Sequence, residues 1–389
     1  MSEQFGIYIH IPYCIQRCSY CDFATYVQSE ILAPAKYVEL LKREIPLRKH
    51  YFGFNNETVK NLSTLYFGGG TPSLIDSQLI VDLITELNKH GFVTRPDTEI
   101  TLEINPATVD ERKLEHYLSA GVNRFSVGAQ TFHDRLLKMV KREHNSKQTL
   151  QTLDLLKKYK LNFSFDLLFA LPTQTLEELK SDVDTAVEIG SKHISPYCLT
   201  IPESHPLSKN RPLDDEQLEM FNIIHQRLTA KNFNRYEISN YSLPGYESRH
   251  NQLYWQDQPY WGLGLSAHSY SKTTKYGHRF WNPNNINIYE KQIQQNLSEL
   301  SAEQIEILNQ HQALTDFCHT SLRIAEGISL SQLTEKFDSK IASRVLEIAK
   351  KMVNHGLIEL KNDHIVLTDS GIHISNQIFE KFTFLDIDI

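Results

Sequence analysis

Three cysteines near the start of the chain have the spacing of a cluster-binding loop. Cys14, Cys18 and Cys21 are separated by three and then two residues, and an alternating apolar run at residues 7–11 precedes them. Four thiolates would complete a zinc site or an iron–sulfur cluster. Three thiolates in one short loop, with no fourth cysteine nearby, would instead leave one iron of a [4Fe–4S] cluster without a protein ligand.

An open iron of this kind could bind the amino and carboxylate groups of S-adenosylmethionine (SAM). The reduced cluster could then pass one electron to the sulfonium and release a 5′-deoxyadenosyl radical. Half of a zinc site, or three buried thiols, is the alternative interpretation, but zinc prefers four ligands. Cys198 and Cys318 lie far away in the sequence. We therefore expect the first three cysteines alone to hold a cluster.

The composition favours a soluble protein with metal chemistry. The 389 residues, of which 40% are apolar and 22% charged, are enough for about two domains. Five cysteines, three of them in one loop, indicate a reducing compartment. The formal charge of -7 without a long basic run argues against nucleic acid as a partner. We see no signal peptide and no apolar run near the ~20 residues of a membrane span, and so expect a cytoplasmic protein.

The cysteine loop must be positioned by the strands and helices that follow. Up to about residue 230, short apolar runs alternate with amphipathic stretches, which predicts parallel βαβ units. We expect strands at residues 5–11, 63–67, 98–104, 124–130, 162–170 and 193–200, and helices at 35–50, 77–90, 110–120, 146–159, 176–189 and 214–230. Six units are two short of a closed eight-fold barrel. The pattern predicts an incomplete (β/α)6 TIM-type barrel at residues 1–232, with a flat doubly wound sheet as the alternative.

The rest of the chain differs in character. Residues 233–300 are rich in aromatic residues and lose helical periodicity, so we expect a connecting segment there. At residues 301–389, two helices (330–337 and 341–354), a β-hairpin turning at Asn362 and Asp363 and a closing helix predict an α+β winged-helix-like C-terminal domain. Winged helices often bind DNA, but the second helix has few cations: Lys340, Arg344, Lys350 and Lys351. We favour a structural or substrate-covering role.

Glycine and polar residues follow the predicted strands at their C-terminal ends. The run Gly68-Gly69-Gly70-Thr71 allows positive φ angles and a close approach of the backbone to a ligand. Glu103 ends the third strand, where a carboxylate could accept hydrogen bonds from the ammonium or ribose of SAM. Gln130 ends the fourth strand and Arg142 follows it, and Asp166 lies in an apolar strand, where a carboxylate is costly without a partner. Each residue alone is more often structural, but together they occupy successive strand ends.

The loop with its preceding residues, Tyr8-Ile9-His10-Ile11-Pro12-Tyr13-Cys14, resembles the CxxxCxxC signature of the radical SAM enzymes. In particular it resembles the oxygen-independent coproporphyrinogen oxidase family, and the resemblance extends over nearly the whole chain. It implies a [4Fe–4S] cluster on the three cysteines and two SAM-sized sites. For the SAM on the cluster it implies Tyr8, Gly69 and Glu103; for the second site it implies Tyr20, Gln130, Arg142 and Asp166, with Gly70 and Thr71 between the two.

Two departures from the oxidase pattern indicate a different branch of this family, the haem chaperone HemW. Oxidase members carry a cysteine two residues after the third cluster cysteine, where this chain has Phe23. They also have a long N-terminal extension, whereas only thirteen residues precede Cys14. The resemblance implies a protein that binds haem and passes it to recipient haemoproteins.

That branch carries a signature which reads His250-Asn251-Gln252-Leu253-Tyr254-Trp255 here. A neutral imidazole is a common axial ligand of haem, and aromatic rings can pack on a porphyrin. We therefore predict His250, Tyr254 and Trp255 as haem contacts, with a surface histidine beside a core Tyr–Trp pair as the alternative. His10, His268 and His278 are rival ligands.

Three functions stay open from the sequence, and we assign no catalytic residue. The first is a haem chaperone with a [4Fe–4S] cluster, SAM and haem, which delivers haem to haemoproteins, with a location of these recipients at the membrane left open. The second is an oxygen-independent coproporphyrinogen oxidase, which removes hydrogen from propionate side chains for decarboxylation. The third is another radical SAM reaction on a porphyrin. Whether the chain forms a homodimer is left open, and whether it is an enzyme is uncertain.

Overall fold

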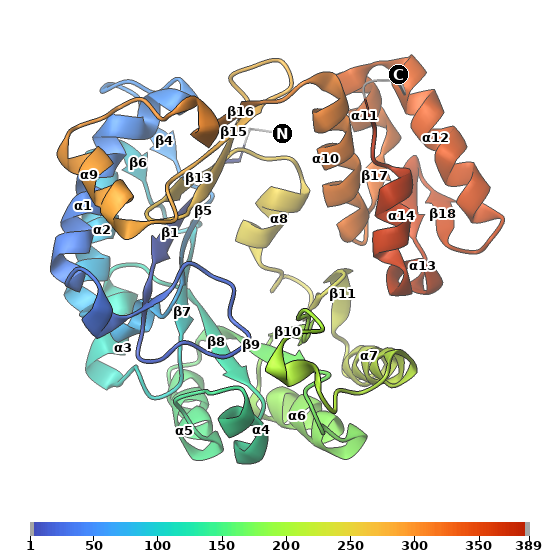
Figure 1. Ribbon diagram of the computed structural model, residues 1–389, viewed down its shortest axis with the longest axis horizontal. Coiled ribbons are helices and arrows are strands. Elements are labelled where there is room, and N and C mark those ends of the chain that lie inside the picture. Colours follow the sequence, from blue (N-terminus) through green and yellow to red (C-terminus); the bar gives the residue numbers. More distant parts are fainter. Residues whose placement is uncertain (1–3, 386–389) are drawn as a thin grey trace.

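The central element is a twelve-stranded sheet, seen in a computed structural model that describes residues 4–385. Its middle consists of six parallel strands in the order β10-β9-β8-β7-β5-β1 (Figure 1). They are β1 (Gly6–Ile11), β5 (Thr64–Gly69), β7 (Glu99–Ile104), β8 (Arg124–Gln130), β9 (Asn162–Phe169) and β10 (His193–Cys198). These confirm the six predicted strands, including their order as successive βαβ units.

Helices follow the parallel strands in sequence and cover the outside of the curved sheet (Figure 1). They are α1 (Pro34–Arg48), α2 (Ser77–Lys89), α3 (Glu111–Ser119), α5 (Ser146–Lys158), α6 (Leu176–Ile189) and α7 (Asp214–Thr229). Capping boxes at Asn145 and Thr175 fix the starts of α5 and α6. A short helix that the sequence did not predict, α4 (Asp134–Met139), follows β8.

Both edges of the sheet are built mostly from the aromatic-rich segment, with β16 following it in the chain. β13 (Tyr260–Leu263) pairs parallel with β1 and is a seventh parallel strand. Antiparallel strands β14 (His268–Ser271), β15 (His278–Trp281) and β16 (Ile305–Ile307) extend this edge, and β12 (Asn240–Ser242) and β11 (Asn234–Glu237) extend the other. The edge strands β11 and β16 do not pair with each other, so the barrel is open, as predicted. The helix α9 (Ile286–Gln294) packs on α1.

Short pairs complete this part of the chain. β2 (Tyr13–Cys14) pairs with β3 (Tyr26–Val27), and β4 (Lys60–Asn61) pairs with β6 (Phe92–Val93). The first pair closes the base of the cysteine loop, because the backbone N–H of Tyr26 also donates to Pro12 O at 2.8 Å.

The helix α8 (Arg249–Trp255) lies at the N-terminal ends of the parallel strands, opposite the cysteine loop. The backbone N–H groups of Arg249 and His250 donate to the carboxylate of Glu99, the first residue of β7, at 3.1 and 3.0 Å. An acidic side chain at a helix N-terminus satisfies N–H groups that lack partners within the helix. α8 therefore forms a floor beneath the open barrel.

The C-terminal part has its own hydrophobic core, which includes Phe317, Leu333, Val345 and Ile365. It consists of α10 (Gln310–Arg323), β17 (Ile328–Ser329), α11 (Leu330–Phe337), α12 (Ser339–Val353), β18 (Ile358–Lys361), β19 (His364–Leu367), α13 (Asp369–His373) and α14 (Ser375–Lys381). The predicted hairpin is present, and both its turn residues have positive φ angles, 44° at Asn362 and 69° at Asp363. The winged-helix-like order of elements is confirmed.

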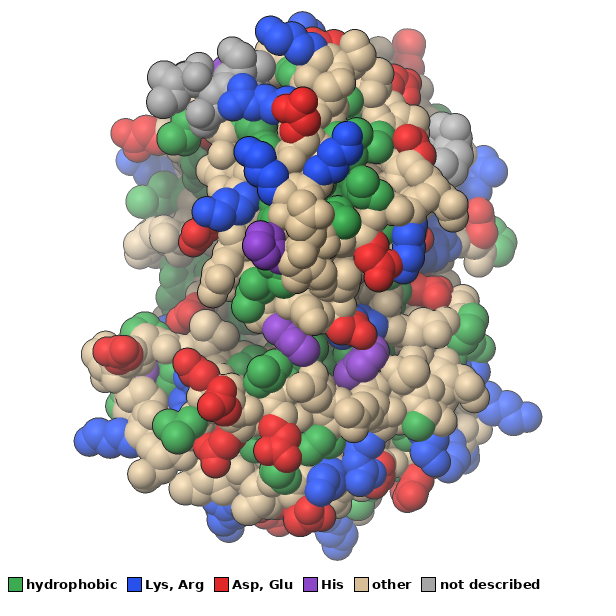
Figure 2. Space-filling view, turned by 90° about the vertical axis from the view of Figure 1, so that its right-hand side faces the viewer, with side chains coloured by type: hydrophobic (Ala, Val, Ile, Leu, Met, Phe, Trp, Pro, Cys, Tyr) green, Lys and Arg blue, Asp and Glu red, His purple; other side chains and the backbone are tan. Residues whose placement is uncertain are grey.

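The face that carries this C-terminal part shows cations interspersed with acidic side chains, rather than one continuous basic surface (Figure 2). Within residues 4–385, no helix has both the length and the apolar character needed to cross a membrane.

Candidate functional site

One cavity opens at the C-terminal ends of the parallel strands and contains all three cysteines of the loop. Its volume is about 420 Å³, and Cys14, Cys18 and Cys21 line its mouth as partly buried, unpaired thiols. Burial raises the pKa of the Cys14 thiol. Binding to iron would offset this effect, because a coordinating thiol is deprotonated by the metal.

The cysteine loop is held in place by contacts with two other loops. Nη1 of Arg142 donates to Sγ of Cys18 at 3.4 Å. The backbone of the next residue, Ser19, makes two further hydrogen bonds. Its N–H donates to Val140 O at 3.3 Å, and its carbonyl oxygen accepts from Nε2 of His205 at 2.8 Å. The position of Cys18 is therefore fixed from the loop after β8 and from the loop after β10.

The thiols do not converge on a single point. Across the described part of the chain, no three His, Cys, Asp or Glu side chains lie close enough together to bind one metal ion. The three thiols nevertheless line one shared cavity.

The structure brings the predicted SAM residues together in this cavity. Its walls include Tyr20, Gly69, Gly70, Thr71, Glu103, Gln130, Arg142 and Asp166. Tyr8 lies behind the wall, where its ring stacks on Tyr66 with 6.0 Å between the ring centroids. The convergence follows from the parallel sheet, whose strands all end at the same edge.

Two half-buried carboxylates face this cavity. Glu103 accepts hydrogen bonds from the Tyr66 hydroxyl at 2.9 Å and from the Gly69 N–H at 3.1 Å, and Asp166 accepts one from the Ser126 hydroxyl at 3.3 Å. Burial raises the pKa of Glu103 to about 7 and the pKa of Asp166 to about 6. A cationic ligand placed between them would stabilise both charged forms.

Glycine is needed at the turn that ends β5, because neighbouring side chains of the protein leave no room for a side chain there. Gly69 has a φ angle of +112°, and a Cβ atom there would lie 2.6 Å from the His10 ring. That ring is fixed, since Nε2 of His10 donates to Ala24 O at 2.9 Å and Nδ1 accepts from the Tyr8 hydroxyl at 3.0 Å. The sequence suggested that the backbone must approach a ligand here, and the structure adds a steric reason on the opposite side of the turn.

We expect Gly69→Ala to destabilise the protein by about 1–3 kcal/mol, because it combines backbone strain with a clash against His10. SAM binding should weaken as well, since His10 precedes the cysteine loop. Gly190→Ala is the matched control, because Gly190 has a similar φ angle of +98° but nothing within 4 Å of an added Cβ. Thermal unfolding and calorimetric titration with SAM would measure both effects, and equal losses in the two variants would exclude a special role for the turn.

The cavity also reaches residues that the sequence interpretation missed. Its deep end is lined by Arg124, Ser126, His193, Ser195 and Asn251, close to the N-terminal ends of the strands. The sequence contains one pattern that could have identified the residues on β8. Residues 124, 126, 128 and 130 alternate along this strand, which places their side chains on the same face.

The wall also includes Cys198, at the end of β10, with its Sγ 3.5 Å from Oε1 of Gln217. Cys318 is fully buried in α10 instead. That neither residue binds the cluster stays a prediction.

The predicted haem residues lie inside the molecule, on α8. His250 is 1% exposed, its Nδ1 lies 2.7 Å from the Thr64 hydroxyl and its Nε2 lies 2.8 Å from the Tyr254 hydroxyl. Burial lowers the pKa of His250 to about 3, so the imidazole is neutral. His250 does not line the cavity, whereas the adjacent Asn251 does. Haem ligation by His250 stays a prediction, and it would require both hydrogen bonds to be replaced.

The other two residues of this signature connect α8 to its surroundings. The Tyr254 ring packs edge-on against Tyr260 at 4.4 Å, and the guanidinium of Arg323, from the end of α10, lies over the Trp255 ring at 4.6 Å. α8 is thus in contact with both the sheet and the C-terminal part.

The rival haem ligands differ in exposure. His10 is 5% exposed and both of its ring nitrogens have hydrogen-bond partners, and His278 is buried on β15. His268 is exposed and stacks on Trp281 with ring centroids 5.5 Å apart. Of these rivals and His250, His268 alone is exposed.

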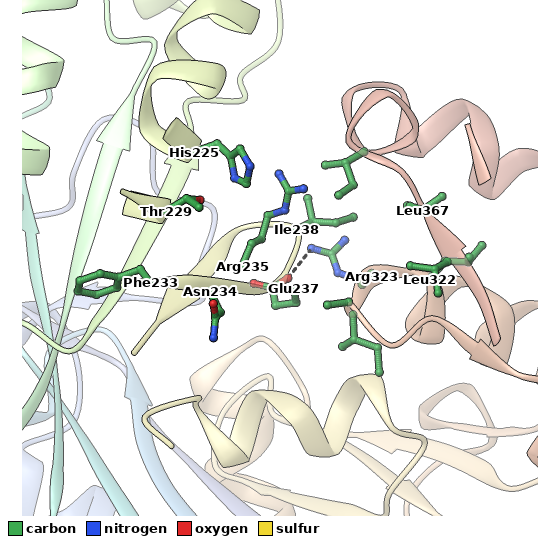
Figure 3. A pocket seen from close by; sticks show the side chains of 14 residues that line it. His225, Thr229, Phe233, Asn234, Arg235, Glu237, Ile238, Leu322, Arg323 and Leu367 are labelled. Carbon is green, nitrogen blue, oxygen red and sulfur yellow. Dashed lines mark ion pairs between the residues drawn. The ribbon is translucent and has the colours of Figure 1, made fainter. Parts of the chain in front are cut away.

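A second cavity of about 300 Å³ lies between the edge of the sheet and the C-terminal part (Figure 3). Across it, Arg323 forms an ion pair with the buried Glu237 at 3.7 Å, and Arg235 forms one with Asp369. A bridge between Glu237 and Ile324 adds backbone hydrogen bonding. These contacts hold the C-terminal part against the barrel edge, next to Trp255.

Comparison with known proteins gives consistent results. A family model of the radical SAM superfamily matches residues 8–186, and one of the HemN C-terminal domain matches residues 308–374. The solved structure of coproporphyrinogen III oxidase (HemN) from Escherichia coli, described as a radical SAM enzyme, superimposes with a TM-score of 0.81 over 98% of this chain and 90% of that chain. At 21% identity, this likeness shows the fold.

Curated relatives match over most of the chain. The chain is 31% identical to the heme chaperone HemW of Lactococcus lactis subsp. lactis (strain IL1403), over 98% of each protein. It is 29% identical to the heme chaperone HemW of Bacillus subtilis (strain 168), over 96% of this chain and 98% of the relative. For the protein of the same name from Synechocystis sp. (strain ATCC 27184 / PCC 6803 / Kazusa), the identity is 35% over 84% of this chain and 79% of the relative.

Proposed function

Since the chain belongs to the HemW family of radical SAM proteins, we propose that it binds a [4Fe–4S] cluster, SAM and haem, and that it passes the haem to recipient haemoproteins. The observation that carries this proposal is the single cavity that unites three cysteines with the glycine turn and two half-buried carboxylates. The five unpaired cysteines support a reducing, cytoplasmic location.

The residues of the cavity fit the cluster and SAM. Cys14, Cys18 and Cys21 would hold the cluster, and the Arg142 guanidinium donates a hydrogen bond to the sulfur of Cys18. Glu103 can accept hydrogen bonds from the ammonium or ribose of SAM, since it is already oriented by Tyr66 and Gly69. Bound together, the cluster and SAM supply one-electron reductive cleavage of the sulfonium.

The rim of the cavity supports haem as the further ligand. Ile15 and Phe23, which are 47% and 66% exposed, both line its mouth. Two large apolar side chains held in solvent at a pocket rim favour contact with an apolar ligand, such as the face of a porphyrin. Phe23 also stands where oxidase members of the family carry an additional cysteine, which supports haem carriage over decarboxylation.

The proposal is tested by incubating the reconstituted, reduced protein and SAM separately with haem and with coproporphyrinogen III. We expect a stable haem complex that loses its haem to an excess of apomyoglobin, followed by absorption spectroscopy. We expect coproporphyrinogen III to be recovered unchanged. Decarboxylated porphyrin in the second incubation would support an oxidase, and the absence of any haem complex would contradict the proposal.

The Cys198→Ala/Cys318→Ala double variant is expected to retain about four irons per chain after anaerobic reconstitution. Cys318 lies in the separate C-terminal core, and Cys198 lies at the end of β10 rather than in the cysteine loop. Iron and sulfide analysis measures the result. Because Cys198 lines the same cavity, its single variant should be measured too, and a loss of iron there would mean that the cluster has a fourth protein ligand.

A further inference from the structure

The deep end of the cavity contains a buried cation that forms no hydrogen bond and no close ion pair with the described residues. Arg124, the first residue of β8, is 3% exposed and lines this end. Its Nε is buried without a hydrogen bond, and within residues 4–385 its guanidinium has neither an ion pair nor a hydrogen bond. Burying an unpaired charge is costly, so this arrangement indicates that Arg124 binds something other than the protein.

A second unpartnered group lies beside it. His193, the first residue of β10, is 1% exposed, and its Nδ1 has no hydrogen bond. Its Nε2 lies 2.7 Å from the Tyr236 hydroxyl, which accepts from the Ser248 N–H at 3.3 Å. If Tyr236 donates its single proton to Nε2, both groups are satisfied and the proton of His193 resides on Nδ1. The imidazole then offers an N–H group to the cavity.

The floor helix contributes a third polar group. Asn251 of α8 lines the same cavity, and its side-chain amide has no hydrogen bond to the described residues. Arg124, His193 and Asn251 come from three different elements, and all three offer N–H donors. A site with several converging donors, one of them a guanidinium, suits an anion.

The two carboxylates of the cavity have other partners. Asp166 accepts a hydrogen bond from Ser126 at 3.3 Å, and Glu103 accepts from Tyr66 and Gly69. Burial raises the pKa of both carboxyl groups, and the charge of Arg124 acts in the opposite direction and lowers it. Neither carboxylate, however, forms a hydrogen bond or a close ion pair with the guanidinium among the described residues, so its donors stay available to a ligand. A role for Arg124 as their more distant counter-charge is the competing explanation, and it makes opposite predictions.

We propose that Arg124, together with His193 and Asn251, binds a carboxylate arm of a porphyrin that enters from the cysteine end. The planar guanidinium can donate two parallel hydrogen bonds to this carboxylate, a geometry that a lysine could not reproduce. For haem, the arm is one of its two propionates. The inference rests on the proposed function, and it adds the place and the residues that recognise the charged edge of the ligand.

The test compares haemin with haemin dimethyl ester, which has the same macrocycle but no carboxylate. Both would be titrated into the wild type, Arg124→Gln, Arg124→Lys and the control Arg135→Gln, with the Soret band as readout. Arg135 is a surface arginine paired with Glu178 at 2.9 Å, away from the cavity lining. We expect Arg124→Gln to bind haemin about tenfold more weakly, the ester affinity to be unchanged, Arg124→Lys to be intermediate and the control to match wild type.

Stability without ligand separates this inference from the structural explanation. Removing an unpaired buried charge should leave the midpoint of thermal unfolding equal to or above that of the wild type. If Arg124 were a counter-charge, Arg124→Gln would unfold earlier or fail to fold, and that outcome overturns the inference.

The two proposals can also fail separately. If the wild type binds neither haemin nor the ester, both the proposed function and this inference fail. If the wild type binds haemin and Arg124→Gln binds it equally well, the haem function stands and the inference is wrong.

Discussion

Replacing Cys18 by alanine is expected to reduce the bound iron from about four atoms per chain to almost none after anaerobic reconstitution. Cys18 is the central cysteine of the loop, and Arg142 holds its sulfur at the cavity mouth at 3.4 Å. With only two thiolates left, the cluster would lack the ligands that fix it to the protein. SAM binding should be lost with the iron, because SAM would occupy the open iron position. Iron and sulfide analysis and calorimetry measure the two effects.

Two controls make this result specific. Cys198→Ala removes another thiol from the same cavity and should leave the iron content unchanged. Arg142→Gln retains all three thiolates and should lower the affinity for SAM more than the iron content. Iron retained at the wild-type level in Cys18→Ala would show that the three cysteines are not its ligands.

Replacing His250 by alanine is expected to have the second largest effect among these variants. The experiment distinguishes a histidine that ligates haem from one that only stabilises the fold. The side chain lies between Thr64 and Tyr254, so its removal leaves two buried hydroxyl groups without this partner. We expect a loss of about 2–3 kcal/mol in the free energy of unfolding. If His250 also ligates haem, the Soret band of the haem complex should shift or weaken while the iron content persists.

Tyr254→Phe is the matched control, since it removes the hydrogen bond to Nε2 but retains the imidazole. A purely structural His250 predicts that both variants lose stability and that both keep the wild-type Soret spectrum. A ligand predicts a changed spectrum in His250→Ala alone. His268→Ala belongs in the same series, because His268 is exposed and stacked on Trp281.

The regular part of the fold was predictable because its sequence pattern is local. Apolar runs with flanking caps define β8 and α6 at the residues where the structure has them, 124–130 and 176–189. β13 was missed since it has four residues, is rich in aromatic residues and joins β1 without the helix that usually connects parallel strands. Its pairing is decided by contacts between residues 6–9 and 260–263, far apart in the chain.

The site was predictable where it depends on strand ends. Residues such as Gly69, Glu103 and Gln130 meet because parallel strands finish at one edge, which a sequence pattern already implies. Arg124 and His193 begin their strands, and at that position a polar residue normally indicates a solvent-exposed end. Here α8 covers that end of the barrel, so these two residues line a cavity instead of the surface. The same floor explains why His250 is buried rather than at the surface.

The most direct measurement for the central claim, that this cavity is built around a cluster with one open iron, is electron paramagnetic resonance of the reduced protein with and without SAM. We predict the signal of a reduced [4Fe–4S] cluster whose g-values change when SAM is added, because SAM would become a ligand of the open iron. The Cys18→Ala protein should show neither the signal nor the change. A cluster signal that SAM leaves unaltered, or a protein that takes up a single zinc ion instead, would contradict the account.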